Sequence, residues 1–445
     1  MKQIAIPLKL FPLALSALAL SAGGVLAHES ASPTRVNPVI EWNRVLLTIV
    51  RTPGAQPATI HPTRSFAIMH AAIYDAVNAI EKSHRPYLLR LFDVSPAASQ
   101  DAAAAAAAHD VLVALYPSFK AALDMQLQES LAQITDGSDQ PEGIRTGQIA
   151  AARILAVRSQ DGSSASPIPF VFGTKPGDYQ STPPNFPPQP QFTHWSRVTP
   201  FTLPRADEFR PGPPPGLTSD RYVDALNEVR TLGVANGTVS SADQVLAGRF
   251  WNGAIQNYWN EIAQSAAGAE HLPTAASARL FALLNLAAAD SVIAFYDAKY
   301  TYNFWRPVTA IRAATVGNSE TVSDPNWLPE VGNTPPDPSY PGAHAAVSAA
   351  ALEVLVSVLK RDRLALTVTS EVLPGVVRAF GSLSDAAEEA TFSRIFAGVH
   401  FRFDLTTGRR MGRSVADFAV DNFLTPQSSE DAGDDDRPRR ERRLQ

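Results

Sequence analysis

A histidine and an aspartate in the C-terminal third of this 445-residue chain stand at a spacing that suits chemistry. His400 and Asp404 are four residues apart in segment 393–404, which has a helical pattern, so both side chains would lie on one helix face. A carboxylate placed there accepts a hydrogen bond from one ring nitrogen of the histidine. The other nitrogen is then free to act as a nucleophile, a base or a metal ligand. Taken alone, the pair equally describes an ordinary ion pair on a helix surface.

Other segments supply cationic partners. Lys299 and Arg306 are seven residues apart, which is two helical turns, so both can point the same way. Pro307 disfavours helical backbone at Arg306, so we expect the helix to end there. His344 follows the loop 338–343 and begins a predicted helix, where free backbone N–H groups favour a bound anion.

Together with Arg394, these groups describe a pocket for a multiply charged oxyanion. Arginine suits such a ligand because its guanidinium forks onto two oxygens. Of two histidines, one can bond the central atom while the other moves protons on the opposite side, and Asp404 orients the first. This is the composition of a phosphoryl-transfer site that works without a metal, or of a site that holds a phosphate-like oxyanion as a cofactor.

In order and in spacing, these residues resemble the three-part signature shared by vanadium-dependent haloperoxidases and type 2 phosphatidic acid phosphatases. Between the blocks lie residues 308–340 and 345–392, intervals that also fit the signature. Segment 304–312 resembles secreted bacterial haloperoxidase-like proteins more than lipid phosphatases. The blocks are Lys299-x6-Arg306-Pro307, Pro341-Gly342-Ala343-His344 and Ser393-Arg394-x5-His400-x3-Asp404.

The resemblance implies a role for each residue. His400 would be the axial ligand to vanadium, Asp404 would orient it, and His344 would act as the acid–base group when peroxide binds. In a phosphatase, His400 would instead attack phosphorus and His344 would protonate the leaving oxygen. The oxygens of vanadate or phosphate would be bound by Lys299, Arg306, Gly342, Ala343 and Arg394.

The middle block departs from the family pattern, which has Ser-Gly-His where this chain has Gly342-Ala343-His344. The serine hydroxyl that would donate to an oxyanion oxygen is missing. Ala343 can still donate its N–H if its φ is negative. One lost hydrogen bond to a charged group is worth about 1.5–3 kcal/mol, so we expect weakened rather than abolished oxyanion affinity.

Three functions are therefore open at the level of sequence. The first is a vanadate-dependent haloperoxidase that oxidises a halide with hydrogen peroxide. The second is a soluble, exported acid phosphatase that acts on a phosphate ester through a phosphohistidine intermediate. The third is a catalytically weakened family member that binds an oxyanion. The resemblance also leaves a homodimer open as the oligomeric state.

Composition limits the other possibilities. Cysteine is absent, which excludes disulfides, thiolate metal sites and a cysteine nucleophile. A net charge of -5 provides no global field that would attract nucleic acid. Apolar residues make up 45% of the chain and charged residues 18%, with abundant alanine, and this favours an all-α fold with a large helical bundle.

The periodicity of apolar residues predicts helices throughout most of the chain. We read His70, Asp75 and His109 as scaffold residues within them. Segment 325–341 is a predicted loop, and 365–369 gives a weak strand signal. Helices are expected at 39–51, 61–81, 101–116, 118–134, 143–158, 218–232, from a Ser240 or Ser241 cap to about 252, and at 255–267, 274–300 and 343–360. Segment 383–422 is expected to contain two helices, or one that is interrupted by the Phe401 region.

The helical pattern is bounded by a leader-like N-terminus and a charged C-terminal tail, and it is interrupted by a proline-rich middle segment. Residues 1–27 read as a signal peptide, which implies export to the periplasm or beyond. An N-terminal helical region is predicted at 28–217, a C-terminal helical region that carries the site at 218–426, and a disordered charged tail at 427–445. Proline density excludes helix from 162–216, and the interleaved aromatic residues predict an ordered, packed loop that covers the core or lines the mouth of a pocket. Beyond the leader, no stable membrane span is expected.

Overall fold

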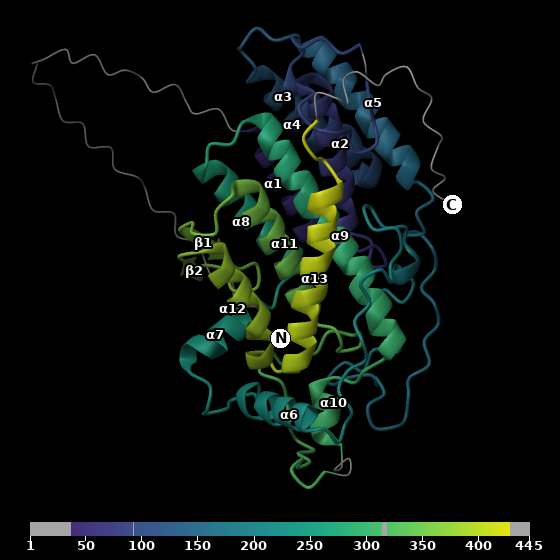
Figure 1. The fold of residues 1–445 in the computed structure, drawn as a ribbon, viewed down its shortest axis with the longest axis vertical. Coiled ribbons are helices and arrows are strands. Elements are labelled where there is room, and N and C mark those ends of the chain that lie inside the picture. The colour runs from purple at the N-terminus through teal and green to yellow at the C-terminus, as the bar shows by residue number, and fades with distance from the viewer. Residues whose placement is uncertain (1–36, 92, 314–317, 428–445) are drawn as a thin grey trace, which may run out of the picture. The chain divides into compact units, whose positions relative to one another are not determined.

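The fold is a helical bundle with one small hairpin, as the composition predicted (Figure 1). The computed structural model describes residues 37–91, 93–313 and 318–427. The predicted signal peptide, and the predicted tail apart from Gln427, lie outside these ranges. The described helices are α1 (Pro38–Arg51), α2 (Thr63–Glu81), α3 (Gln100–Leu115), α4 (Lys120–Ala132), α5 (Gln140–Arg158), α6 (Asp220–Leu232), α7 (Ala242–Phe250), α8 (Ile255–Ala269), α9 (Thr274–Tyr302), α10 (Pro307–Arg312), α11 (Ala343–Leu359), α12 (Leu383–Phe396) and α13 (Arg402–Asn422).

Helix starts are set by local capping chemistry. The side chains of Ser99, Asp139 and Ser219 accept hydrogen bonds from the first turns of α3, α5 and α6. At the start of α7, Ser241 and Gln244 form a reciprocal capping box. Each cap satisfies backbone N–H groups that have no partner inside the helix. The sequence had offered both Ser240 and Ser241 for α7, and the structure selects Ser241.

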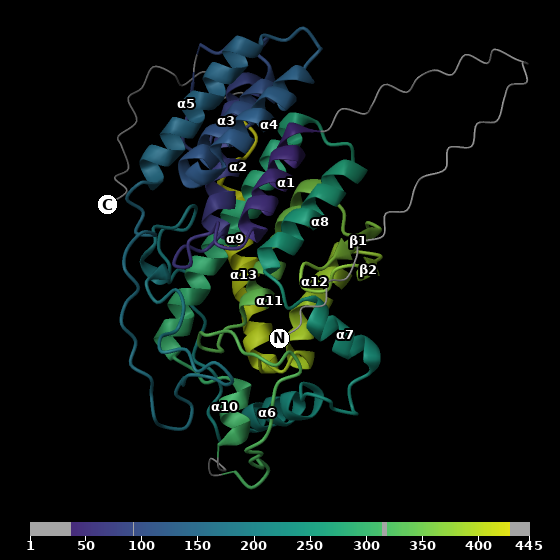
Figure 2. The same ribbon diagram turned by 180° about the vertical axis from the view of Figure 1, so that it is seen from behind.

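Helix α9 forms the centre of the bundle. It packs against α2, α11 and α13, and Figures 1 and 2 show it running through the molecule beside α13. Among the described residues, α9 is the one helix long and apolar enough to cross a membrane, but 94% of its most apolar window is buried inside the protein. Its apolar surface is therefore used for core packing. At one end of the bundle lie α3, α4 and α5, and at the other lie α6 and α10.

Segment 162–216 is ordered and packs over α9, as its prolines and aromatics predicted. Buried Asp290 of α9 accepts hydrogen bonds from the backbone N–H groups of Phe201, Thr202 and Leu203 at 2.6 to 3.0 Å. A second attachment joins Arg210 to Asp297 at 2.6 Å. The loop also contains a short 3-10 helix, Trp195–Arg197. Because α9 carries Lys299 at its C-terminal end, the loop covers the bundle next to the predicted site.

The structure corrects several local predictions. Helix α10 was not predicted. The strand signal at 365–369 belongs to a hairpin whose first strand, β1 (Leu366–Thr369), pairs antiparallel with an unpredicted second strand, β2 (Val377–Phe380). Lys299 and Arg306 do not share a continuous helix, because α9 ends at Tyr302 with Asn303 in the left-handed conformation and Arg306 is the N-cap of α10.

Candidate active site

His400 lies between two helices, which confirms the break expected near Phe401 within 383–422 and corrects the placement of His400 and Asp404 on one continuous helix. Helix α12 ends at Phe396, and Gly398 has a φ of 80°, a value that glycine adopts without strain. Helix α13 then begins at Arg402, with Phe401 as its N-cap. The Cβ of a larger residue at 398 would lie 2.3 Å from the Gly233 carbonyl oxygen, so this turn requires glycine.

The predicted contact between His400 and Asp404 is present, although its geometry is that of a helix start. Asp404 Oδ2 accepts a hydrogen bond from His400 Nδ1 at 3.0 Å and another from the Phe401 backbone N–H at 3.0 Å. The Ser339 hydroxyl donates to the same oxygen at 2.6 Å. These bonds assign the proton of the neutral imidazole to Nδ1 and leave a lone pair on Nε2.

Arg306 brings its guanidinium to that free nitrogen. Its Nη1 lies 3.1 Å from His400 Nε2 and donates to the Val399 carbonyl at 2.8 Å. The other side of the guanidinium binds Asp337, through Nε to the backbone carbonyl at 2.7 Å and through Nη2 to Oδ1. Lys299 Nζ donates to the same Oδ1 at 3.1 Å. Lys299 and Arg306 therefore meet at one buried carboxylate.

Arg394 and His344 are held together by the loop between α7 and α8. His344 Nε2 donates to the Trp251 carbonyl at 2.9 Å, which leaves Nδ1 as the unprotonated nitrogen. Arg394 donates through Nη1 to the same carbonyl at 3.3 Å and through Nη2 to Asn252 Oδ1 at 3.0 Å. Arg394 Nε has no partner among the described residues. This buried guanidinium thus binds neutral acceptors and no carboxylate.

Burial and mutual repulsion shift the acid–base behaviour of the cluster. Burial lowers the pKa of Lys299 to about 8, against the attraction of Asp337, and lowers the pKa of Arg394 to about 9 with help from Arg306. Burial lowers the pKa values of His344 and His400 well below the ordinary value, and the positive charges of Arg394 and Arg306 lower them further. Both imidazoles are therefore neutral at pH 7.

The two carboxylates behave differently from each other. Burial raises the pKa of Asp404 to about 6, against the hydrogen bonds from Ser339 and Phe401. Burial also raises the pKa of Asp337, but the charges of Lys299 and Arg306 outweigh it and hold this pKa below its ordinary value. Both carboxylates are therefore ionised at pH 7.

The middle block forms the start of α11 next to α13. Gly342 is the N-cap of α11, and its N–H donates to the Asp404 carbonyl at 3.0 Å. Ala343 is the first helical residue and is not among the residues with positive φ, so its N–H is available as a donor without backbone strain. Gly342 therefore fastens α11 to α13, and the Ala343 N–H is the member of this pair left to contact a ligand.

These residues fit a tetrahedral oxyanion. Lys299, Arg306 and Arg394 are each no more than 1% exposed, and only two carboxylates, those of Asp337 and Asp404, accompany them in the contacts described above. Buried cations without full compensation are costly, and an anion offsets that cost. A neutral imidazole whose unprotonated Nε2 contacts only the Arg306 side chain among the hydrogen bonds of the described residues suits a ligand to a metal centre such as vanadium. No group of three or more His, Asp or Glu residues able to hold a metal ion occurs within the described ranges.

Sequence reasoning missed the residues that hold this cluster. Asp337, Ser339, Trp251 and Asn252 all lie in loops and have no periodic spacing to the signature blocks. The one available signal was the position of Asp337 and Ser339 just before Pro341, inside a segment that had been treated as a turn-rich connection. Trp251 acts through its backbone carbonyl, a role that residue type does not reveal.

Other predicted residues and pockets lie apart from the cluster. His70 bonds Asn43 at 2.9 Å in the core, and Asp75 accepts from the backbone at 87–89, so both are scaffold residues. His109 bonds Asp110 and Asp124.

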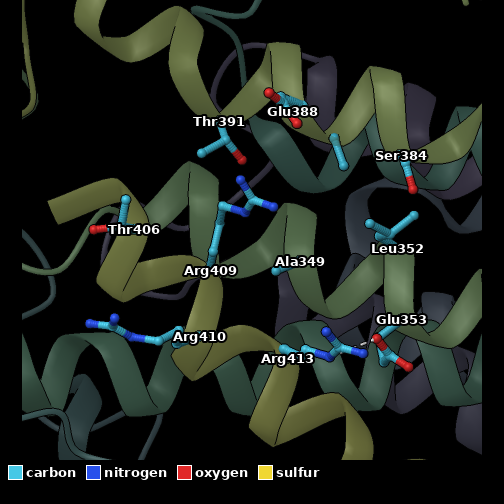
Figure 3. A pocket seen from close by; sticks show the side chains of 11 residues that line it. Ala349, Leu352, Glu353, Ser384, Glu388, Thr391, Thr406, Arg409, Arg410 and Arg413 are labelled. Carbon is cyan, nitrogen blue, oxygen red and sulfur yellow. Dashed lines mark ion pairs between the residues drawn. The ribbon is translucent and has the colours of Figure 1, made fainter. Parts of the chain in front are cut away.

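A pocket of about 390 Å³ opens between α11, α12 and α13 (Figure 3). Its lining includes Arg409, Arg410 and Arg413, and Arg413 is paired with Glu353 at 3.2 Å. None of the predicted site residues lines it.

Comparison with known proteins agrees with the helical fold and with the resemblance to vanadium haloperoxidases. Residues 279–427 match the family model described as the VCPO second helical-bundle domain. The chain is 26% identical to a vanadium chloroperoxidase from Curvularia inaequalis, over 84% of this chain and 80% of that protein.

Solved structures give the same result. A structure described as the first bacterial vanadium-dependent iodoperoxidase is 24% identical, covers 88% of this chain and 97% of its own, and superposes with a TM-score of 0.74. A holo-type bacterial vanadium-dependent chloroperoxidase is 17% identical, covers 87% and 93%, and gives a TM-score of 0.59.

Proposed function

We propose that this chain, which resembles the vanadium haloperoxidases in sequence and has their helical-bundle fold, is a vanadate-dependent haloperoxidase that oxidises a halide with hydrogen peroxide. The observation that carries the proposal is the buried cluster around His400 Nε2. Arg306 contacts this nitrogen at 3.1 Å, and Lys299 and Arg394 add two more buried cations. Such a cluster is complementary to a tetrahedral oxyanion.

Each residue has a defined task in this proposal. Lys299, Arg306 and Arg394 would bind the oxygens of vanadate, and the Ala343 N–H would assist at the start of α11. His400 would offer Nε2 to vanadium while Asp404 holds the proton on Nδ1. When bound, vanadate would supply a Lewis-acid centre for the activation of peroxide.

His344 would move the proton. The hydrogen bond from Nε2 to the Trp251 carbonyl fixes this tautomer and leaves Nδ1 able to accept a proton from a substrate. The lowered pKa keeps the imidazole unprotonated at neutral pH, as a proton acceptor must be. Arg394 donates to the same carbonyl, and its positive charge lowers the pKa of His344. An oxyanion bound to Arg394 would therefore change how readily His344 accepts a proton.

The leader-like residues 1–27 support a further proposal, that the enzyme acts after export, in the periplasm or outside the cell. Such compartments expose an enzyme to halide and peroxide from the surroundings. A homodimer is proposed only from the resemblance. Secretion is tested by fractionating cells that express the full chain, and oligomeric state by light scattering of the purified protein.

The function is tested by adding vanadate to purified apo-protein and assaying two reactions side by side. The expected result is halogenation of a phenolic dye with peroxide and bromide, chloride or iodide. Hydrolysis of p-nitrophenyl phosphate that vanadate inhibits, with no halogenation of the dye by any halide, would overturn the proposal in favour of a phosphatase.

The site assignment is tested by His400→Ala, with His271→Asn as the matched control. The His400 variant is expected to lose vanadate binding and halogenation. His271 is exposed and distant in sequence from the signature blocks, so its variant should match the wild type. If His400→Ala retains halogenation, His400 is not the vanadium ligand.

A further inference from the structure

A buried carboxylate that belongs to none of the signature blocks binds two of the oxyanion-site cations. Asp337 lies in the loop before α11 and is 4% exposed. Its Oδ1 accepts from Lys299 Nζ at 3.1 Å and from Arg306 Nη2. A carboxylate at this place occupies donor atoms that an incoming oxyanion would use.

The protein holds Asp337 firmly in this position. Its Oδ2 accepts from Gln191 Nε2 at 3.2 Å and from the Tyr296 hydroxyl at 3.4 Å. Its backbone carbonyl accepts from Arg306 Nε at 2.7 Å. Because side-chain and main-chain contacts both fix the residue, Asp337 stays beside Lys299 and Arg306 when these cations bind a ligand.

The charge balance of the cluster follows from this placement. Lys299, Arg306 and Arg394 are positive, whereas Asp337 and Asp404 are negative and the histidines are neutral at pH 7. The excess is therefore a single positive charge. The positive charge is also unevenly placed. Among the described residues Arg394 has no carboxylate partner, whereas Asp337 pairs with Lys299 and Arg306.

We propose that Asp337 is a specificity-determining residue that selects oxyanions that retain a proton, such as vanadate and phosphate, over fully ionised oxyanions such as sulfate. An oxygen bound by Lys299 or Arg306 shares its donor with Asp337 Oδ1 and is therefore a neighbour of that carboxylate. A protonated oxygen can donate a hydrogen bond to the carboxylate. An oxygen of sulfate has no proton to donate and meets a like charge in a buried site.

This selection rests on the proposed oxyanion site, and it predicts one orientation of the bound oxyanion. Ionised oxygens would face Arg394 and the start of α11, where no carboxylate lies in the described contacts. A protonated oxygen would face Asp337. For an exported enzyme, exclusion of sulfate would keep a common tetrahedral anion from competing with vanadate.

The test uses isothermal titration calorimetry of the purified full chain with vanadate, phosphate and sulfate at pH 7 and low salt. Wild-type protein is expected to bind vanadate and phosphate at least about tenfold more tightly than sulfate, which is the effect of one charge-assisted hydrogen bond. Asp337→Asn is expected to shrink this ratio by about tenfold, mainly through tighter sulfate binding. The matched control is Asp297→Asn, which removes a carboxylate of α9 that pairs with Arg210 outside the site.

Two results would overturn the inference. One is an unchanged phosphate-to-sulfate ratio in folded Asp337→Asn. The other is wild-type protein that binds sulfate as tightly as phosphate, a measurement that decides the question even if the variant does not fold. If vanadate binds in either case, only the role of Asp337 fails. If none of the three anions binds, the proposed function fails with it.

Discussion

The orientation of His400 depends on a hydroxyl as well as on a carboxylate. Ser339 donates to Asp404 Oδ2 at 2.6 Å, and its oxygen lies 3.4 Å from His400 Nδ1. The hydroxyl therefore shares with Asp404 the task of fixing the imidazole. It comes from the loop before α11, so it ties the middle block of the signature to the third block.

Ser339→Ala should weaken vanadate binding without abolishing it. Loss of the donor raises the pKa of Asp404 further, so a larger fraction of this carboxyl is protonated near neutral pH and no longer accepts the hydrogen bond from His400 Nδ1. Mutation of a residue that orients a metal ligand typically lowers the affinity for the metal, or the activity, by about 10–100-fold. Vanadate titration should show this loss, while Ser323→Ala, a serine bonded to the Arg312 carbonyl outside the site, should bind normally. Equal affinity in the two variants would contradict the role of Ser339.

The Gly342 position separates a hydroxyl effect from a steric one. A Cβ at Gly342 would lie 2.9 Å from Leu405 Cδ2, the end of a flexible side chain that must shift to accept it. Gly342→Ser should still bind vanadate more tightly, by roughly tenfold, because the hydroxyl adds a donor to a charged ligand. Gly342→Ala carries the same Cβ without the hydroxyl and is the matched control. If the two variants bind vanadate equally, the hydroxyl is supplied from elsewhere or is not needed.

At the scale of elements, the proline-rich segment is attached to the central helix at several points, and the buried side chain of Asp290 is one of them. Asp290 accepts from three consecutive backbone N–H groups at 201–203 and from the Thr202 hydroxyl. Its pKa is raised by burial, against these four bonds. The attachment lies two and a half turns before Lys299 on the same helix, so it positions the loop that supplies Gln191 to Asp337.

Asp290→Asn should loosen this segment. An amide nitrogen cannot accept the bonds that one carboxylate oxygen now receives, so buried donors lose their partner at a cost of about 1–3 kcal/mol. We expect a lower melting temperature and faster proteolysis within 162–216. Asp224→Asn, at an exposed carboxylate of α6 outside this segment, should leave both unchanged. Undiminished stability of the Asp290 variant would mean that the other contacts of the loop, such as the Arg210–Asp297 pair, are sufficient to hold it.

The sequence predicted the elements that have a repeating apolar pattern and missed those that are too short or too irregular to have one. Long helices such as α2 and α9 follow from repeating apolar positions, and the order of the loop 162–216 follows from its aromatics. Helix α10 has only six residues, too few for a period to be read. The turn at His400 was read as helix because Gly398, with its positive φ, sits inside an otherwise periodic segment. Sequence therefore identified the signature residues, but the loops that hold them, 251–253 and 337–339, required the structure.

At the scale of the whole molecule, the site joins parts of the bundle that are far apart in sequence. Lys299 lies in the last turn of α9, Arg306 caps α10, His344 lies in the first turn of α11 and Arg394 lies in the last turn of α12. A ligand that binds all of these groups therefore links four helices. One of them, α9, runs beside α13 along the bundle (Figure 1). Binding to the folded state alone raises stability, by about 2.7 kcal/mol at a ligand concentration one hundred times Kd.

The stabilisation by vanadate should therefore depend on pH, through Lys299. In the ligand-free protein the pKa of Lys299 is lowered to about 8, so its charge destabilises the fold below pH 8. That loss is recovered as the pH rises from about 8 toward the ordinary lysine pKa of 10.5. A bound oxyanion attracts the protonated Lys299, so in the complex the charge of this lysine stabilises the fold instead of destabilising it.

Thermal melts across the pH range measure this dependence. The vanadate-induced rise in melting temperature should be large at pH 7 and should shrink above pH 8, where Lys299 loses its charge. Vanadate loses protons in the same range, so Lys299→Arg is the control: a guanidinium stays charged, and the decline should begin at a higher pH. An identical decline in both proteins would assign it to the anion and not to Lys299.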